Sequence, residues 1–271
     1  MQLRHIDPGP RLKAYIHKIW VFESSVGIPN EDMRMIVPSG RIKLVIPYHN
    51  VASNTNGLVH SYRSNSIMLV GVTDTPRIIN DAKNNPSGTI GIEFNPEGAY
   101  RFFHLNQSEL KNKIHSLTDV LGKIAGELEE KISEIASVTG KVDLIQQFLL
   151  QQFTKLDSDL IFEYCVNRIR LSRGNININA LEKETGYSSR WLNVKFLEKI
   201  GLSPKNLSSV MRFNYFYHLL ASGNSVFFTE KEFYNSYYDQ SHFIKDFKRF
   251  TGLPPTKLAK ASNDFGKIFM R

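Results

Sequence analysis

The C-terminal part of the chain repeats itself, and this duplication constrains the fold more than any other feature. Residues 51 positions apart match in type at four places: Leu192 with Phe243, Phe196 with Phe247, Gly201-Leu202 with Gly252-Leu253, and Pro204 with Pro255. Apolar residues, a glycine and a proline thus recur in the same order. The pattern predicts two copies of one supersecondary unit.

The first copy has the local signals of two short helices joined by a tight turn. Residues 178–184 predict the first helix, and Gly186 in the following turn can adopt positive φ. Ser188 is a good N-cap for a second helix over residues 189–200. The arrangement is a helix-turn-helix, whose second helix can enter the major groove of DNA.

The faces of each second helix follow from an advance of about 100° per residue. In the first copy this places Leu192, Phe196 and Ile200 on the core side. Arg190, Trp191 and Val194 lie on the opposite side. The second copy, with Asp239 as its expected N-cap, turns phenylalanines inward and polar residues outward: Phe243, Phe247 and Phe250 against Ser241, His242, Lys245 and Arg249. Between the copies, residues 204–222 predict a long helix that holds both units rigidly.

Charge favours a polyanionic partner for this part of the chain. The 271 residues include 34 Lys+Arg and 26 Asp+Glu, for a net charge of +8. Residues 1–156 hold 17 basic and 15 acidic residues, whereas residues 157–271 hold 17 and 11. The basic excess therefore lies mainly in the duplicated part.

Composition predicts a soluble, cytoplasmic protein. Hydrophobic residues make up 41% of the chain and charged residues 22%, which is typical of globular domains. No stretch approaches the ~18–20 apolar residues of a membrane-spanning helix, so we expect no membrane association. The first residues lack the apolar segment of a signal peptide, and the single cysteine, Cys165, cannot form an internal disulfide.

The first ~95 residues differ from the rest, because short alternating apolar runs predict strands there. These runs are Ile42/Leu44/Ile46, residues 67–72, and Ile90/Ile92/Phe94. From Pro96 onward residues 117–135 and 142–153 have helical spacing, with Gly140 and residues 155–159 as expected break points. The sequence predicts an α+β fold of two domains: β-rich residues 1–157, ending in packed helices, and all-α residues 158–271.

Several segments of the second domain resemble the DNA-binding module of AraC/XylS-type bacterial transcription regulators. They are Gly186-Tyr-Ser-Ser-Arg-Trp, Gly201-Leu-Ser-Pro-Lys, Tyr237-Tyr-Asp-Gln-Ser-His-Phe and Leu253-Pro-Pro, within residues 160–260. The resemblance implies two helix-turn-helix units that read successive major grooves. By position, the base-facing residues would be Arg190, Asn193 and Val194 in the first unit and Ser241, His242 and Lys245 in the second. Phosphate contacts would come from Ser188, Lys195, Lys199, Lys205, Gln240, Lys248 and Arg249, with Lys257 a further candidate.

This sequence departs from the family pattern in both units. Val194 stands where members often have arginine, and valine offers only apolar contact, for instance to a thymine methyl. In the second unit Ser236 occupies the turn-glycine position, and Lys231, Glu232 and Asn235 replace apolar or small residues of the supporting helix. Either that helix rotates to bury Phe228, Phe233 and Tyr234, or this unit is less stable than its relatives.

The N-terminal half resembles a domain of unassigned role found ahead of such modules. The resemblance rests on Trp20 near the end of a first helix, Val37-Pro-Ser-Gly, Gly71-Val-Thr-Asp-Thr-Pro and Gly91-Ile-Glu-Phe-Asn-Pro-Glu-Gly-Ala-Tyr. It implies a cupin-like barrel or sandwich used for sensing or dimerisation. Trp20, Arg41, Arg77 and Tyr100 could line a ligand pocket or simply belong to the core, so the effector pocket stays unassigned. Simple alternation turns Glu93 outward, as a solvated residue or ion-pair partner.

These features favour a DNA-binding transcription regulator that has no catalytic residues, metal site or cofactor. Expected partners are double-stranded DNA, a small-molecule effector, a second copy of the chain and, for an activator, RNA polymerase. No two histidines have H-x-H or H-x-x-x-H spacing, and a lone Cys165 in an apolar helix is best interpreted as a small buried residue. The alternatives are an alkyl-transfer repair enzyme, which would need nucleophilic thiolates, and a protein-interaction module whose second unit no longer binds DNA.

Overall fold

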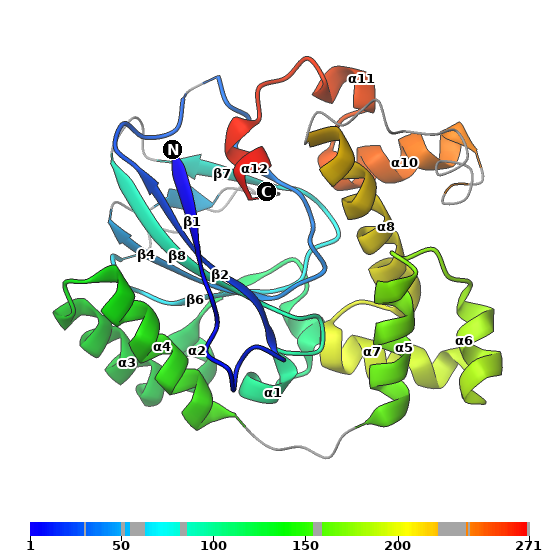
Figure 1. Cartoon of the computed structure of the whole chain (residues 1–271), viewed down its shortest axis with the longest axis horizontal. Coiled ribbons are helices and arrows are strands. Elements are labelled where there is room, and N and C mark those ends of the chain that lie inside the picture. The colour runs from blue at the N-terminus through cyan, green and yellow to red at the C-terminus, as the bar shows by residue number, and fades with distance from the viewer. Residues whose placement is uncertain are drawn as a thin grey trace.

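The computed structural model describes residues 1–29, 31–49, 52–54, 63–81, 86–153, 159–221, 237 and 239–269. Its first part is built on antiparallel sheets and its second part on helices (Figure 1). The predicted α+β organisation is therefore confirmed. Within the described residues no helix is both long and apolar enough to cross a membrane.

The larger sheet contains six antiparallel strands in the order β1 (Gln2–Ile6), β2 (Ile16–Ser24), β8 (Ser87–Phe94), β4 (Lys43–His49), β6 (Met68–Val70), β9 (Ile114–Ser116). A smaller sheet joins β3 (Met35–Ile36), β7 (Arg77–Asp81) and β5 (Ala52–Asn54). The three predicted alternating runs form β4, β6 and β8. In the register of the central pair, Ile19 lies opposite Ile92 and Val21 opposite Ile90, so apolar residues share one face.

Strand β2 corrects the expectation that Trp20 ends a first helix. Ile19 and Val21 belong to the main hydrophobic core, whereas Trp20 and Phe22 pack on the other face, in a cluster with Phe265 and Phe269. Both faces of the strand are thus covered, and its sequence lacks the alternation that marks a half-exposed strand. The covering residues come from the far end of the chain.

The helices that follow the sheet are α1 (Tyr100–Phe103), α2 (Leu117–Leu121), α3 (Lys123–Glu134) and α4 (Val138–Gln152), with a 3-10 turn at Gln107–Leu110. Gly140 is not a break point, because it lies in the first turn of α4, where its N–H donates to the hydroxyl of Ser137 at 3.1 Å. The predicted helix over 117–135 is divided at Gly122, whose φ of 59° favours glycine.

The described helices of the second part are α5 (Leu160–Leu171), α6 (Ile178–Thr185), α7 (Ser189–Ile200), α8 (Pro204–Ala221), α10 (Gln240–Thr251), α11 (Pro255–Leu258) and α12 (Asp264–Ile268). The first helix-turn-helix, α6 and α7, is confirmed, as is the long helix α8. Gly186 has the predicted left-handed conformation, with φ of 74°. The expectations for Phe228, Lys231, Glu232, Phe233, Tyr234, Asn235 and Ser236 fall outside the described residues.

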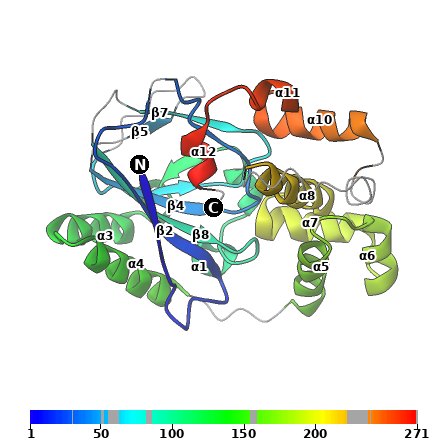
Figure 2. The same ribbon diagram turned by 45° about the horizontal axis from the view of Figure 1, so that its top comes forward.

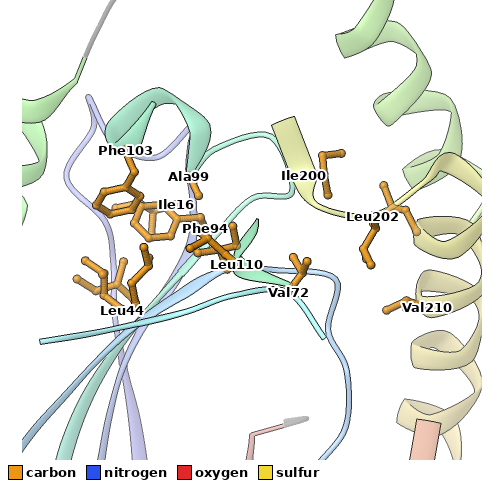
Figure 3. Packing of buried hydrophobic residues seen from close by; sticks show 14 of the residues in the cluster. Ile16, Leu44, Val72, Phe94, Ala99, Phe103, Leu110, Ile200, Leu202 and Val210 are labelled. Atoms are coloured by element: carbon orange, nitrogen blue, oxygen red, sulfur yellow. The ribbon is translucent and has the colours of Figure 1, made fainter. Parts of the chain in front are cut away.

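One hydrophobic cluster runs from the sheet into the helical part. Figure 3 shows Ile200, Leu202 and Val210 of the helical part facing Val72 and Leu110 of the β-rich part. All five residues belong to this cluster. The two parts are therefore joined by apolar packing, which resists a change in their relative orientation more strongly than polar contacts alone.

The C-terminal segment turns back onto the β-rich part, where α12 lies against the sheet (Figures 1 and 2). The Asn263 side chain accepts from the Met35 N–H at 2.8 Å and donates to the Met35 carbonyl at 3.0 Å. Asp32 accepts from the Phe265 N–H at 2.8 Å. These bonds fix the segment so that the Phe265 ring packs edge-on against Phe22, with centroids 5.3 Å apart.

Candidate nucleic-acid interface

Helix α7 is held at both ends and buried along one face. The Ser188 hydroxyl accepts from the Trp191 N–H at 3.3 Å, and Gly201 ends the helix in the left-handed conformation. Leu192, Phe196 and Ile200 are fully buried, as predicted. The opposite face carries the three predicted base-facing residues, all exposed: Arg190, Asn193 and Val194.

The turn between α6 and α7 is fixed by polar and aromatic contacts. Glu182 of α6 accepts a hydrogen bond from the Ser189 N–H at the start of α7. Trp191, expected on the outer face, is half-buried because its ring lies against Tyr187 at a centroid distance of 4.2 Å. Lys195 lies over the same indole at 5.8 Å. Trp191 therefore supports the exposed face of α7 from its side.

Helix α10 repeats this design in the second unit. Asp239 is its N-cap, as predicted, and accepts from the His242 N–H at 2.7 Å. Its core face consists of three buried phenylalanines, Phe243, Phe247 and Phe250. The opposite, polar face is exposed and carries Gln240, Ser241, His242, Lys245 and Lys248. Buried Asp246 pairs with Arg212 of α8 at 3.1 Å, which connects the helix to the linker.

Two of the residues predicted to contact phosphate pair with carboxylates within the protein. The Lys199 ammonium lies 2.8 Å from Asp159 and 4.8 Å from the Phe162 ring centroid, and its side chain is only 15% exposed. Lys199 therefore lies toward the core side of α7. Arg249 of α10 lies 3.2 Å from Asp74 of the β-rich part, although its side chain stays 38% exposed. Lys205 and Lys257 are exposed.

The two exposed faces offer different chemistry. Arg190 presents the guanidinium donors that pair with a guanine edge, and Asn193 presents the amide that pairs with an adenine edge. Val194, with 57% of its surface exposed, and neighbouring Leu197, with 39%, offer apolar contact only. Lys245 supplies a flexible cation in the second unit. Leu197 was missed from the sequence, although its helical position beside Arg190 and Val194 could have indicated it.

The β-rich part contains an apolar cavity of about 130 Å³. Three of the four predicted pocket residues, Trp20, Arg41 and Arg77, line it. Tyr100 does not, because it lies near the helical part and donates to Glu198 of α7 at 2.9 Å. Phe265 and Phe269 from the C-terminal segment also line the cavity, which the sequence could not show because no local pattern links residues so far apart.

Of the two roles expected for Glu93, a solvated residue or an ion-pair partner, the structure shows the second, in a buried setting. Its side chain is 3% exposed and lies 3.2 Å from the Lys43 ammonium. Burial alone would raise the pKa of Glu93, but Lys43, Lys18 and Arg41 together lower it to about 2. Glu93 is therefore a buried carboxylate within a cluster of cations. Its burial has the same cause as that of Trp20, since β8, like β2, is covered on both faces.

Other reactive groups are scarce among the described residues. No group of three or more His, Cys, Asp or Glu side chains there is arranged to hold a metal ion. Cys165 is buried in α5, as predicted, and burial raises the pKa of its thiol to about 11. A thiol of this kind is a poor nucleophile at neutral pH.

Residues 4–116 match the family model described as a domain of unknown function, DUF6597. No curated protein matches the chain. Among solved structures, the chain is similar to the 1.65 Å structure of ToxT from Vibrio cholerae, with 15% identity and a TM-score of 0.45, over 93% of this chain and 97% of that one.

A second similar structure is wild-type ToxT from Vibrio cholerae strain SCE256 bound to an unsaturated fatty acid. The identity is 16% and the TM-score 0.44, over 92% of this chain and 96% of that one. The family model covers residues 4–116 of the 271, ahead of the helix-turn-helix formed by α6 and α7.

Proposed function

We propose that this protein is a sequence-specific, double-stranded DNA-binding transcription regulator without enzymatic activity. The observation that carries the proposal is the construction of α7. The helix is capped, fully buried along Leu192, Phe196 and Ile200, and exposed along Arg190, Asn193 and Val194. A rigid helix that turns donors and apolar groups to solvent is suited to reading base edges in the major groove.

The β-rich domain is proposed to control DNA binding through a small-molecule effector or a second copy of the chain. The apolar cavity supports the first possibility, because ligand sites are mostly apolar and contain a few polar groups, as Arg41 and Arg77 do here. An activator would in addition contact RNA polymerase. A cytoplasmic location follows from these roles, because the DNA and polymerase of bacteria are there.

The test begins with selection of bound fragments from genomic DNA by the full chain, followed by affinity measurements at several salt concentrations. Affinity should fall steeply with salt, because phosphate contacts release counterions. On the selected site, Arg190→Ala and Lys245→Ala should each cost ~1–3 kcal/mol, and much less on random DNA. Lys123→Ala is a matched control, because Lys123 is a 90% exposed lysine on α3.

The outcomes separate the candidate functions. Equal losses on selected and random DNA would make Arg190 and Lys245 phosphate contacts rather than base contacts. No enrichment of any fragment at low salt would contradict the proposal and favour the protein-interaction module.

A further inference from the structure

A second, more polar cleft of about 340 Å³ lies between the two parts of the chain. Its walls come from strands β1, β2, β4 and β8, from the end of β3 and the loop before β4, from α5 with Arg173 after it, from α8, and from α12 with Phe269 after it. The volume lies within the range of ~300–1,000 Å³ that is typical of ligand sites. Its position means that anything bound there touches both domains.

The cleft is lined by five cationic side chains and one carboxylate: Lys18, Arg41, Lys43, Arg170 and Arg173 with Glu93. Glu93 is already engaged, because it pairs with Lys43 at 3.2 Å. The other lining groups that can titrate are three histidines and a tyrosine: His5, His17, His218 and Tyr215. Four positive charges thus face a space in which no free carboxylate lies among the described residues.

Among the described residues, the hydrogen-bond or stacking partner of each of these four cations is neutral, and Glu93, which also acts on Lys18 and Arg41, is shared with Lys43. Lys18 donates to the Phe269 carbonyl at 3.0 Å, and Arg41 to the Ser39 carbonyl at 3.5 Å. Arg170 donates to the Asn167 amide oxygen at 2.8 Å, and Arg173 stacks on the Tyr215 ring at 4.3 Å. The Arg41 Nε is buried and has no hydrogen-bond partner among the described residues. Buried guanidinium groups normally have an anionic partner.

The pKa values of two histidines in the cleft also indicate an excess of positive charge. Burial and then Arg41 lower the pKa of His17 to about 4, and burial followed by Lys18 and Arg41 also lowers that of His218. Glu97, in a neighbouring polar pocket, acts on Arg41 and Arg170 from outside the cleft. The cleft is therefore a region of positive potential that disfavours a further proton and favours a bound anion.

We propose that this interdomain cleft binds a small molecule that carries a phosphate or diphosphate group. A single carboxylate would neutralise only one of the four cations, whereas a phosphate ester brings up to two negative charges and a diphosphate more. Guanidinium groups match phosphate oxygens in a bidentate manner, and three of the four cations are arginines. Lys18 and Arg41 would hold the group from the β-rich domain, and Arg170 and Arg173 from the helical one.

The site deepens the proposed function, because a ligand held from both sides would fix the orientation of the DNA-binding module. Anion binding itself does not depend on that function and can be measured without DNA. The test is isothermal titration of the full chain with pyrophosphate, and with acetate at the same ionic strength. Pyrophosphate should bind saturably, one per chain, and acetate should not.

Two variants locate the site without disturbing the core, because Arg170 and Arg173 are exposed. Arg170→Gln and Arg173→Gln should each weaken pyrophosphate binding by about tenfold or more, the loss expected for one charge-assisted contact. Lys123→Gln, on α3, removes the same charge elsewhere and should leave binding unchanged. Arg190→Ala, on the DNA-reading face, should also leave it unchanged.

Three results would overturn the proposal. The first is that pyrophosphate does not bind saturably. The second is that Arg170→Gln, Arg173→Gln and the unchanged chain bind it equally well. The third is that Arg190→Ala loses binding, which would place the anion on the proposed DNA-reading face. Failure of DNA binding with intact pyrophosphate binding would refute only the proposed function. Intact DNA binding without pyrophosphate binding would refute only this inference.

Discussion

Asp74 of the β-rich domain forms an ion pair with Arg249 of α10, on the proposed DNA-binding side of the chain. Its Oδ2 lies 3.2 Å from Arg249 of α10 and 2.6 Å from Lys111, and Oδ1 accepts from Asn112 at 2.8 Å. Burial opposes ionisation, but the hydrogen bonds from Lys111 and Asn112 keep the pKa of Asp74 below its usual value. An arginine that already faces an ionised carboxylate gains less from a DNA phosphate. We therefore expect Asp74→Asn to raise the affinity for DNA.

The size of the effect follows from the exposure of the pair. Arg249 is 38% exposed and Asp74 13%, and pairs at such sites contribute ~0.2–1 kcal/mol. Releasing Arg249 should thus raise affinity by about 1.5-fold to 5-fold. If the released guanidinium contacts one phosphate, the slope of log affinity against log salt should steepen by about 0.9. Asparagine retains an oxygen that can accept from Asn112.

Fluorescence anisotropy with one labelled duplex at several salt concentrations measures both quantities. Glu127→Gln is the matched control, because it also removes one negative charge from an ion pair, here with Lys123 within α3 at 3.6 Å. The control corrects for the change in net charge. If Asp74→Asn and Glu127→Gln give the same affinity and the same salt slope, Arg249 is not a phosphate contact restrained by Asp74.

Three further predictions concern stability and reactivity. Asn263→Ala should lower the free energy of unfolding, measured in urea, by about 2–4 kcal/mol, because it leaves the buried Met35 N–H and carbonyl without the Asn263 side chain as partner. A loss under about 1 kcal/mol would contradict this. The pKa of Glu93 is about 2 in the folded protein, below its ordinary 4.5, so the free energy of unfolding should fall as the pH drops from 4.5 toward 2. The fall should be smaller in Glu93→Gln. Identical plots of stability against pH for the two proteins would show that Glu93 does not titrate in this range. Cys165 should resist iodoacetamide at pH 8 until the chain unfolds, and rapid alkylation of the native protein would refute its burial.

Sequence reasoning was most successful where the determinants are local. The turn at Gly186, the caps Ser188 and Asp239 and the phenylalanine face of α10 are set by residues within a few positions of one another. Their chemistry is visible in a short window, because caps and glycine turns act through neighbouring backbone groups. The exposed faces of α7 and α10 followed from helical periodicity alone.

The misassignments arise where distant segments meet. Trp20 and Glu93 lie on strands that are covered on both faces, so neither shows the alternation that would reveal its surroundings. The cover over Trp20 comes from Phe265 and Phe269, and the partner of Arg249 is Asp74. Such pairs depend on how the two domains dock, and no local signal encodes docking. The interdomain cleft is invisible to sequence reasoning for the same reason.

The docking also gives α7 and α10, the two helices proposed to read DNA, unequal connections to the β-rich domain. Helix α7 runs into the shared core through Ile200 and Leu202, and at Gly201, where φ is 84°, an added Cβ would lie 2.5 Å from the Gln107 carbonyl oxygen. This end of α7 should move with the β-rich domain as one body, because close-packed apolar contacts transmit displacement.

Helix α10, by contrast, contacts the β-rich domain through the ion pair of Arg249 with Asp74, beside a looser approach of Gly252 to Pro76. An ion pair of this exposure weakens with salt and breaks at small cost, whereas the apolar contact of α7 does neither. A rearrangement of the β-rich domain would therefore reorient α7 directly. Its effect on α10 would depend on whether the Arg249–Asp74 ion pair breaks or stays formed. The two half-sites of an operator should accordingly respond differently to the same effector, with the response of the second more sensitive to ionic strength.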